Sequence, residues 1–251
     1  MHSDKADKIF GINPVTEVLR AGRSVQRLLI AENRKSDRDV QEIIRLAKGK
    51  GIEVRMTTRD ALNREAPNAL HQGVLAIAAA REYGTLYDIL QIPSQKGQVP
   101  LFLILDGVED PRNLGAILRT AEVAGVHGVI IPERRAAGLT ETVAKVAAGA
   151  LEYVPVVKVV NIVNTLEDLK KAGVWITGAE ASGDTVYWDA DFVRPTAIVL
   201  GGEDRGVRRL VREHCDYLVS LPLMGKINSL NVSVATGALL YEVLRQRRAL
   251  G

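Results

Sequence analysis

Residues that form metal centres and disulfide bridges are scarce in this chain. Cys215 is the one cysteine among 251 residues, and the four histidines, His2, His71, His127 and His214, show no ligand-like spacing. A single thiol excludes an internal disulfide framework and a thiolate-rich metal site. We therefore expect chemistry that needs no metal. We also expect Cys215 to be a small packing residue rather than a nucleophile.

Long apolar runs and aromatic side chains are scarce as well. Aromatic residues make up 4% of the chain, and the longest apolar runs, such as 101–105, have the length of a strand. A membrane-spanning helix needs about 18 apolar residues. The charged segment 1–8 is followed by no apolar signal core. We therefore expect no membrane partner and a cytoplasmic location for a chain whose composition is that of a globular protein.

Positive charge is concentrated in one part of the chain. Residues 1–81 contain 15 Lys and Arg against 10 Asp and Glu, a balance of +5, whereas the remainder contains 18 against 20. A basic segment attached to a more neutral unit is typical of a phosphate-binding module joined to a second domain. Nucleic acid is one class of partner that this pattern favours.

The first 80 residues show the pattern of a small α/β domain. Apolar positions at Val40, Ile43, Ile44 and Ala47 recur with the period of a helix. The sequence further predicts a helix over 13–21, capped by Asn13, and strands at 27–30, 52–56 and 74–78. We place the first domain at residues 1–80.

The second domain is expected at residues 99–251. Breaker and polar residues in 81–98 predict a linker, in which 86–90 could form one helical turn. After it, strand and helix patterns alternate from the apolar run 101–105 to a long final helix over 230–247. Such alternation predicts an α/β fold with a parallel sheet covered by helices.

Three strand-to-helix loops carry the candidate functional residues. They follow the predicted strands 101–105, 197–200 and 217–221, and ligands of parallel sheets bind just beyond these carboxyl ends. In the first loop, Asn113 is either a helix cap or a ligand-binding side chain. Arg119 is either a solvated helix residue or a phosphate-binding one, and its apolar neighbours would make an idle charge costly.

The second and third loops each leave two interpretations open. Three glycines surround Glu203, namely Gly201, Gly202 and Gly206. They form either a flexible turn or a loop that lets a ligand approach the backbone. The third loop collects three small polar side chains, Asn228, Ser229 and Asn231, at the start of the final helix. One of them suffices as a cap, so the other two favour a functional role.

Together these loops closely resemble the three ordered motifs of the SpoU family of RNA ribose 2′-O-methyltransferases, which belongs to the SPOUT superfamily. The matching stretches run from Asn113 to Arg119, from Gly201 to Gly206 and from 221 to 235. The motifs at 10–15 and 71–74 resemble the ribosomal-protein-like substrate-binding domain that bacterial rRNA guanosine-2′-O-methyltransferases place first. The resemblance implies a deep trefoil knot in the second domain, an exception to the usual unknotted chain.

The resemblance also implies a cofactor, partners and site residues. The cofactor would be S-adenosylmethionine, without a metal, and the partners would be large-subunit (23S) rRNA and a second copy of the chain in a homodimer. The implied cofactor-binding residues are Leu200, Gly201, Gly202, Leu221, Ile227, Ser229 and Leu230. The implied catalytic residues are Asn113, Arg119, Glu203, Ser229 and Asn231.

The implied reaction is in-line attack of a ribose 2′-oxygen on a sulfonium methyl group. The same resemblance implies that the ribose belongs to a guanosine. The family assigns the hydroxyl proton to the arginine at Arg119, but a guanidinium is not deprotonated in proteins. Our hypothesis is that Arg119 binds a phosphate and stabilises the developing alkoxide. Alternatives are 2′-O-methylation of tRNA and a non-catalytic RNA-binding or ribosome-assembly factor. Asp204 stands where the family commonly has glycine.

Overall fold

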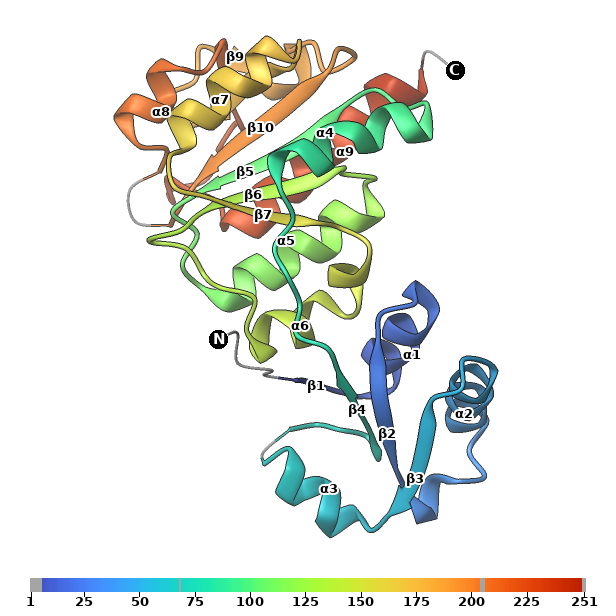
Figure 1. The fold of residues 1–251 in the computed structure, drawn as a ribbon. Helices are drawn as coiled ribbons and strands as arrows, with labels where there is room; N and C mark the ends of the chain where they lie inside the picture. The colour runs from blue at the N-terminus through green and yellow to red at the C-terminus, as the bar shows by residue number, and fades with distance from the viewer. Residues whose placement is uncertain (1–5, 68, 204–205, 250–251) are drawn as a thin grey trace. The chain divides into compact units, whose positions relative to one another are not determined.

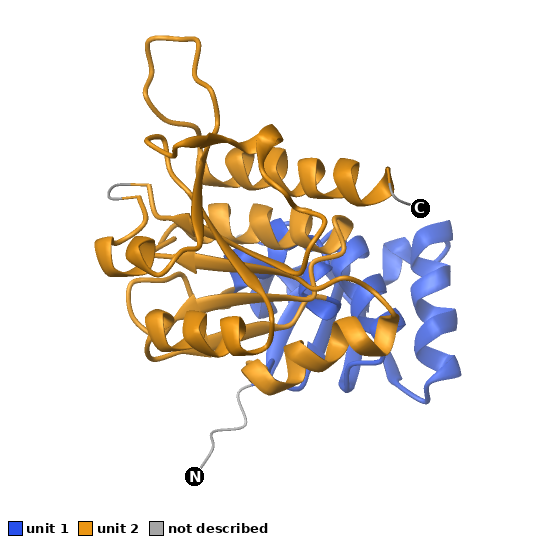
Figure 2. Cartoon of the chain, turned by 90° about the horizontal axis from the view of Figure 1, so that it is seen from above, with its two compact units in different colours: residues 1–82, 141–153 blue, residues 83–140, 154–251 orange. Residues whose placement is uncertain are grey.

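The computed structural model describes residues 6–67, 69–203 and 206–249, and these residues form two compact units. Unit 1 contains the described part of Met1–Glu82 together with Glu141–Tyr153 (Figure 2). Unit 2 contains Tyr83–Thr140 and the described part of Val154–Gly251. No helix in these described ranges has the length and apolar character needed to cross a membrane.

Unit 1 is built on a four-stranded sheet in the order β1-β4-β2-β3 (Figure 1). β4 pairs antiparallel with β1 and β2, and β2 pairs parallel with β3. Its elements are β1 (Asp7–Phe10), α1 (Ile12–Ala21), β2 (Val25–Ala31), η1 (Glu32–Arg34), α2 (Arg38–Gly49), β3 (Glu53–Thr57), α3 (Arg59–Glu65), β4 (Val74–Ala78), α6 (Glu141–Ala147) and η2 (Ala150–Glu152).

The core of unit 1 confirms the predicted helical period of α2, since Val40, Ile43 and Ala47 are buried against the sheet. The predicted cap of α1 is wrong. The helix begins at Ile12, and its N-cap is Gly11, whose φ of 97° is open to glycine because it has no Cβ. The short elements β1 and α3 were not predicted, because charged residues interrupt their apolar pattern.

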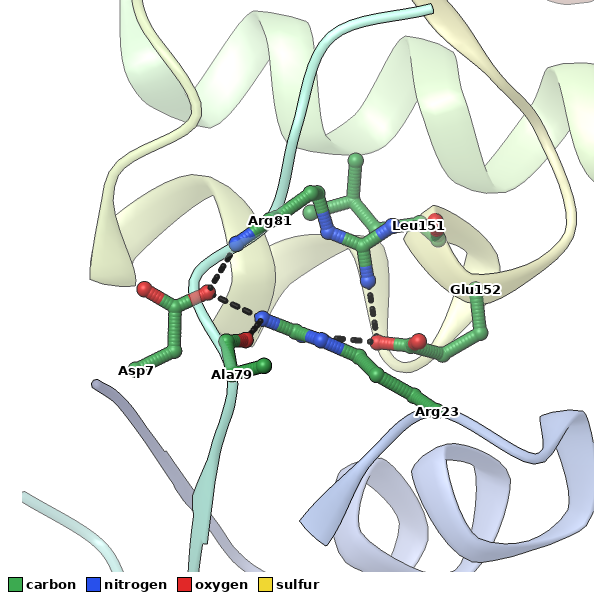
Figure 3. A network of polar contacts seen from close by, with 6 residues as sticks. All are labelled: Asp7, Arg23, Ala79, Arg81, Leu151 and Glu152. Carbon is green, nitrogen blue, oxygen red and sulfur yellow. Dashed lines mark hydrogen bonds and ion pairs between the residues drawn. The ribbon is translucent and has the colours of Figure 1, made fainter. Parts of the chain in front are cut away.

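A buried ion network joins the two sequence segments of unit 1 (Figure 3). Glu152, whose side chain is 7% exposed, accepts hydrogen bonds from the guanidinium groups of Arg23 and Arg81. Arg23 also donates to the Asp7 carboxylate, and Arg81 also donates to the carbonyl oxygen of Leu151. Burial lowers the pKa of Arg81, and the nearby Glu152 carboxylate opposes that shift. Segment 141–153, which the sequence pattern placed in the second domain, is held in unit 1 by these charges.

Unit 2 is built on a seven-stranded sheet in the order β7-β6-β5-β10-β8-β11-β9, and all its strand pairs are parallel. The predicted parallel sheet is therefore confirmed. Its elements are α4 (Leu86–Lys96), β5 (Leu101–Asp106), α5 (Pro111–Val123), β6 (Gly128–Pro132), β7 (Val156–Val159), α7 (Ile162–Lys171), β8 (Trp175–Ala179), β9 (Thr185–Val186), η3 (Tyr187–Asp189), β10 (Thr196–Gly201), α8 (Arg209–Glu213), β11 (Tyr217–Ser220) and α9 (Val232–Arg248).

Both faces of this sheet are covered. Phe102 and Ile104 of β5 lie in one buried cluster with residues of α4 and α7. Leu103 is buried on the opposite face, since side chains alternate along a strand. Helices α5 and α9 pack against each other, and α9 contacts β10. Strands covered on both faces explain why 101–105 is a continuous apolar run.

The predicted linker contains a helix that is longer than the single turn at 86–90 which the sequence pattern allowed. Most of 81–98 is α4, which starts with a capping box. The Thr85 amide donates to the Asp88 carboxylate, and the Asp88 amide donates to the Thr85 hydroxyl oxygen. Ile89 and Pro93 of α4 are buried. Pro93 inside the helix misled the prediction, because proline removes a backbone donor and usually marks a helix end.

Candidate active site

The three loops singled out by sequence meet at the carboxyl edge of the unit 2 sheet. β5 and β10 are neighbours in register, so Gly201 lies opposite Asp106. The Gly202 amide donates to the Asp106 carbonyl oxygen at 3.0 Å. Asp106 also accepts two bonds from Arg208, at 2.9 Å from the backbone amide and 2.7 Å from Nε. The first and second loops are thus tied together at their bases.

A chain of side-chain hydrogen bonds connects all three loops. Asn113 Nδ2 donates to Glu203 Oε1, and Asn231 Nδ2 donates to Asn113 Oδ1 at 3.0 Å. Asn231 Oδ1 in turn accepts from the Ser233 hydroxyl at 2.6 Å and from its backbone amide at 2.9 Å. The structure therefore brings together Asn113, Glu203 and Asn231, which are far apart in the sequence.

Helix capping resolves two of the alternatives left open by the sequence. Asp110 is the N-cap of α5 and accepts from the Arg112 amide at 2.7 Å, so Asn113 is not a cap. Its amide group is free to join the second and third loops. Asn231 is the N-cap of α9, and its side chain both caps the helix and contacts Asn113.

A cavity of about 450 Å³ lies between the second and third loops and the end of β8. Its volume is within the range of about 300–1,000 Å³ typical of small-molecule sites. The lining residues are Ala179, Glu180, Ala181, Leu200, Gly201, Gly202, Glu203, Gly206, Leu221, Leu223, Ser229, Leu230, Asn231, Val232 and Ala235.

Two glycines of this wall are required by close backbone packing. A Cβ on Gly201 would overlap the backbone of Gly206, and a Cβ on Gly202 would overlap the carbonyl group of Gly107. The glycine-rich second loop is therefore a compact turn of fixed shape in its described part. The Asp204 position lies outside the described residues.

The predicted cofactor residues are gathered at this cavity with one exception. Leu200, Gly201, Gly202, Leu221, Ser229 and Leu230 line it. Ile227 does not, and its side chain is 76% exposed. Sequence reasoning missed the contribution of β8, because nothing in its sequence shows that it lies between β10 and β11.

Arg119 takes no part in the hydrogen bonds that connect the three loops. It is exposed on α5, does not line the cavity, and has no hydrogen-bond or ion-pair partner among the described residues. The apolar neighbours do not make its charge costly, as the sequence suggested, because the side chain is exposed. At about 100° per residue, Arg119 points away from the buried face formed by Ile117, Leu118 and Ala121.

Comparison with known families decides what kind of site this is. The model of the SpoU rRNA methylase family matches residues 100–241, and a model described as RNA 2′-O ribose methyltransferase substrate binding matches residues 8–84. The chain belongs to the SpoU rRNA methylase family. The resemblance seen in the three loops is confirmed, and the protein is an RNA methyltransferase of this family.

Individual members of the SpoU family match over almost the whole chain. A TrmH family tRNA/rRNA methyltransferase of Bacillus subtilis, YacO, is 45% identical and covers 99% of both chains. The 23S rRNA (guanosine-2′-O-)-methyltransferase RlmB of Shewanella oneidensis is 43% identical over 98% of this chain and 99% of its own. The solved SpoU methyltransferase AviRb of Streptomyces viridochromogenes, in complex with AdoMet, is 28% identical with a TM-score of 0.81, covering 97% of this chain and 91% of its own.

The cavity residues fit S-adenosylmethionine, the methyl donor of these enzymes. The Glu180 side chain reaches the cavity wall with Oε1 3.4 Å from Arg212 Nη1, while Oε2 is buried without a hydrogen-bond partner. A buried acceptor without a partner is costly, and a donor group of a bound ligand would satisfy it. In the described part of the chain, no cluster of His, Cys, Asp and Glu side chains could hold a metal ion.

Proposed function

We propose that the protein methylates the 2′-oxygen of a guanosine in 23S rRNA, in the cytoplasm, as a homodimer. The observation that carries the proposal is a row of side-chain hydrogen bonds that runs from Glu203 through Asn113 to Asn231. It borders a cavity of cofactor size. The similarity to RlmB over 98% of the chain supports the choice of 23S rRNA and guanosine. The basic excess of residues 1–81 is consistent with an RNA-binding unit.

In this proposal the chain supplies position and polarity. Bound S-adenosylmethionine supplies an electrophilic methyl group on a sulfonium. Glu203, held by Asn113, accepts a hydrogen bond from the ribose hydroxyl and orients its oxygen toward the donor cavity. Asn231 and Ser233 hold Asn113 in place. Such alignment of reacting atoms supplies a large share of the rate enhancement.

Arg119 has a separate role in the proposal. During transfer the O–C bond forms, the C–S bond breaks to leave a neutral thioether, and the hydroxyl proton passes to water, because a guanidinium stays protonated and cannot receive it. Arg119 would instead bind an RNA phosphate and stabilise negative charge on the 2′-oxygen. Arg119→Lys should therefore lower turnover and RNA affinity, because lysine lacks the bidentate geometry. Unchanged turnover and affinity would contradict this role.

The homodimer is supported by the exposed face of α5 and α9. Val123 of α5 is 63% exposed, and Val234 and Tyr241 of α9 are 57% and 56% exposed. Gly237 of α9 lies close to Thr120 of α5, so these apolar side chains come from two helices in contact. We propose that a second copy covers this face, and that Arg119 acts in the site of that copy.

The chemical proposal is tested with purified protein, methyl-labelled S-adenosylmethionine, and unmodified transcripts of 23S rRNA and tRNA. Label recovered as one 2′-O-methylguanosine in the 23S transcript is the expected result, and nuclease mapping names the nucleotide. Label in tRNA would overturn the substrate assignment. Donor binding without label in either RNA would contradict naked rRNA as substrate, and absence of donor binding would favour a non-catalytic factor.

The dimer proposal is tested by subunit mixing. Arg119→Ala and Glu203→Gln chains carry different affinity tags, are co-expressed, and their mixed dimers are isolated. If both residues serve one site from different copies, a two-fold dimer has one intact site and about half of wild-type activity. Each homodimeric variant should be inactive. Inactive mixed dimers would place both residues in a site of one chain, and a monomeric wild type would refute the dimer itself.

A further inference from the structure

A second cavity of about 290 Å³ lies beside the donor cavity in unit 2. Gly202, Glu203 and Gly206 line both cavities, so the second loop forms the wall between them. The opposite side of the second cavity is the loop that follows β6, with Arg134 and Arg135. No residue predicted from the sequence to be functional lies on that loop.

The loop after β6 has a defined backbone conformation. The Glu133 amide donates to the Val159 carbonyl oxygen at 2.9 Å, and the Ala137 amide donates to the Val108 carbonyl oxygen at 2.9 Å. Between these anchors, Arg135 has a φ of 60°, in the left-handed region that long side chains rarely adopt. Local strain of this kind is concentrated at functional sites.

The charges of this cavity divide into paired and unpaired groups. At its base, the buried Asp106 carboxylate is neutralised by Arg208. Arg134 and Arg135 are exposed, and neither has a hydrogen-bond or ion-pair partner among the described residues. Two carboxylates, those of Glu109 and Glu203, also face the cavity.

This combination selects the chemistry of the ligand. Two free guanidinium groups favour a phosphate oxygen, which they can bind in bidentate geometry. The two carboxylates would repel a simple anion but accept hydrogen bonds from sugar hydroxyls. A nucleotide unit, with one phosphodiester beside a ribose, satisfies both sets of groups.

We propose that Arg134 and Arg135 bind the phosphodiester next to the methylated ribose in the second cavity, so that the 2′-hydroxyl faces Glu203 and the donor cavity. The inference rests on the proposed function and extends it to residues outside the three family motifs. It requires only unit 2, since every lining residue that carries it lies in that unit.

The test uses the full-length chain with Arg134→Gln, with Arg134→Gln combined with Arg135→Gly, and with Lys96→Gln as a matched loss of charge. Glycine at position 135 retains the left-handed backbone. Lys96 is exposed on α4 and lines neither cavity. The affinity for the labelled 23S transcript is measured by filter binding over a range of salt concentrations, and S-adenosylmethionine affinity is measured by calorimetry.

We expect each arginine removed from the second cavity to weaken RNA binding about tenfold or more, as for loss of a hydrogen bond to a charged group. The slope of log affinity against log salt should fall by about 0.7 per lost phosphate contact on single-stranded RNA. The affinity for S-adenosylmethionine and the circular dichroism spectrum should not change. Lys96→Gln should match the wild type.

Three results would overturn the inference. RNA affinity and salt slope equal to those of Lys96→Gln would show that Arg134 and Arg135 do not bind phosphate. Loss of donor affinity in the variants would show that the loop shapes the donor cavity instead. If the wild-type chain neither binds nor methylates the transcript, the proposed function itself fails, whereas a wild type that methylates RNA with unaffected arginine variants refutes this inference alone.

Discussion

The two units use their charged side chains differently. In unit 1, the buried Glu152 is satisfied by Arg23 and Arg81, and these contacts hold segment 141–153 to the sheet domain (Figure 3). In unit 2, Arg134 and Arg135 have no partners among the described residues, and Glu180 Oε2 is buried without one. Charges that satisfy one another stabilise a fold, whereas a buried acceptor without a protein partner and exposed guanidinium groups beside a cavity leave bonds that a ligand can form.

The glycine wall of unit 2 gives the strongest expected effect. Gly202→Ala would place a Cβ on the carbonyl group of Gly107 and force the second loop out of shape. We expect turnover to fall by about 100-fold or more, because a shift of about 1 Å at a reacting site lowers the reaction rate by that amount. Transfer of labelled methyl groups from S-adenosylmethionine to the 23S transcript measures it. Gly225→Ala is the matched control, since no atom lies within 4 Å of its Cβ position, and equal effects of both variants would contradict the prediction.

The ion network of unit 1 should give a large effect on stability and little on donor binding. Glu152→Ala leaves Arg23 and Arg81, with side chains only 14% and 19% exposed, without their shared carboxylate. Removing one partner of a buried pair costs about 3 kcal/mol in the free energy of unfolding. Urea denaturation checks this value. Lys171→Ala, which removes an exposed ion pair, should leave the midpoint unchanged, and a similar shift in both variants would refute the distinction.

A buried histidine in unit 2 predicts a loss of stability in acid. The Leu101 amide donates to His127 Nδ1, so the ring proton is on Nε2 and bonds Gln98. Burial, with smaller effects from Lys96 and Arg247, lowers the pKa of His127 to about 4 from its ordinary value of 6.5. Between these two pKa values the unfolded chain binds a proton that the folded chain does not. The contribution of the neutral His127 to the free energy of unfolding is therefore complete above pH 6.5 and is lost as the pH falls toward about 4.

The size of the His127 effect follows from the shift. Lowering the pKa of His127 from 6.5 to about 4 corresponds to a loss of about 3 kcal/mol in the free energy of unfolding by pH 4. Urea unfolding at pH 7 and pH 4.5 measures it for the wild type and for His127→Gln. The variant should be less stable at pH 7 but lose less on acidification. Parallel profiles for the two proteins would rule out His127 as the source.

The smallest of these effects concerns the donor cavity. Glu180→Gln keeps the shape of the side chain but replaces one of the two carboxylate oxygens, Oε1 or Oε2, with an amide NH2 group, which donates hydrogen bonds. We expect about tenfold weaker S-adenosylmethionine binding, with unchanged RNA affinity, because one charged hydrogen bond to the ligand is lost. Calorimetry and filter binding separate the two affinities. Glu213→Gln, on the exposed part of α8, serves as the control, and unaltered donor affinity in Glu180→Gln would show that Oε2 contacts no donor atom.

Sequence reasoning recovered the parts of the fold that depend on local pattern. The apolar run 101–105 predicted a strand buried on both faces, and Val40, Ile43 and Ala47 predicted one face of a helix, because these periods follow from backbone geometry. It allowed only the first turn of α4, because Pro93 suggested a break although a capping box at Thr85 starts a helix that continues to Lys96. The capping box favours a helix and the proline opposes one. Packing decides between them, because the helix buries Ile89.

The candidate site was only partly readable from the sequence. Asn113, Glu203 and Asn231 were found because unusual polar residues follow parallel strands, whose ends meet at one edge. Glu180, Arg134 and Arg135 were not found, since each is an ordinary charged residue in its own segment. Their importance depends on which loops become neighbours.

The sequence by itself determined the family, the alternation of strands and helices, and the set of polar residues at three loops, because these are recorded in local order and motif. The tertiary structure decided that Asp110 rather than Asn113 caps α5, that Arg119 lines neither cavity, and that segment 141–153 belongs to unit 1. These outcomes depend on contacts between residues distant in the chain. Burial and partner choice are properties of the assembled fold, so no local pattern contains them.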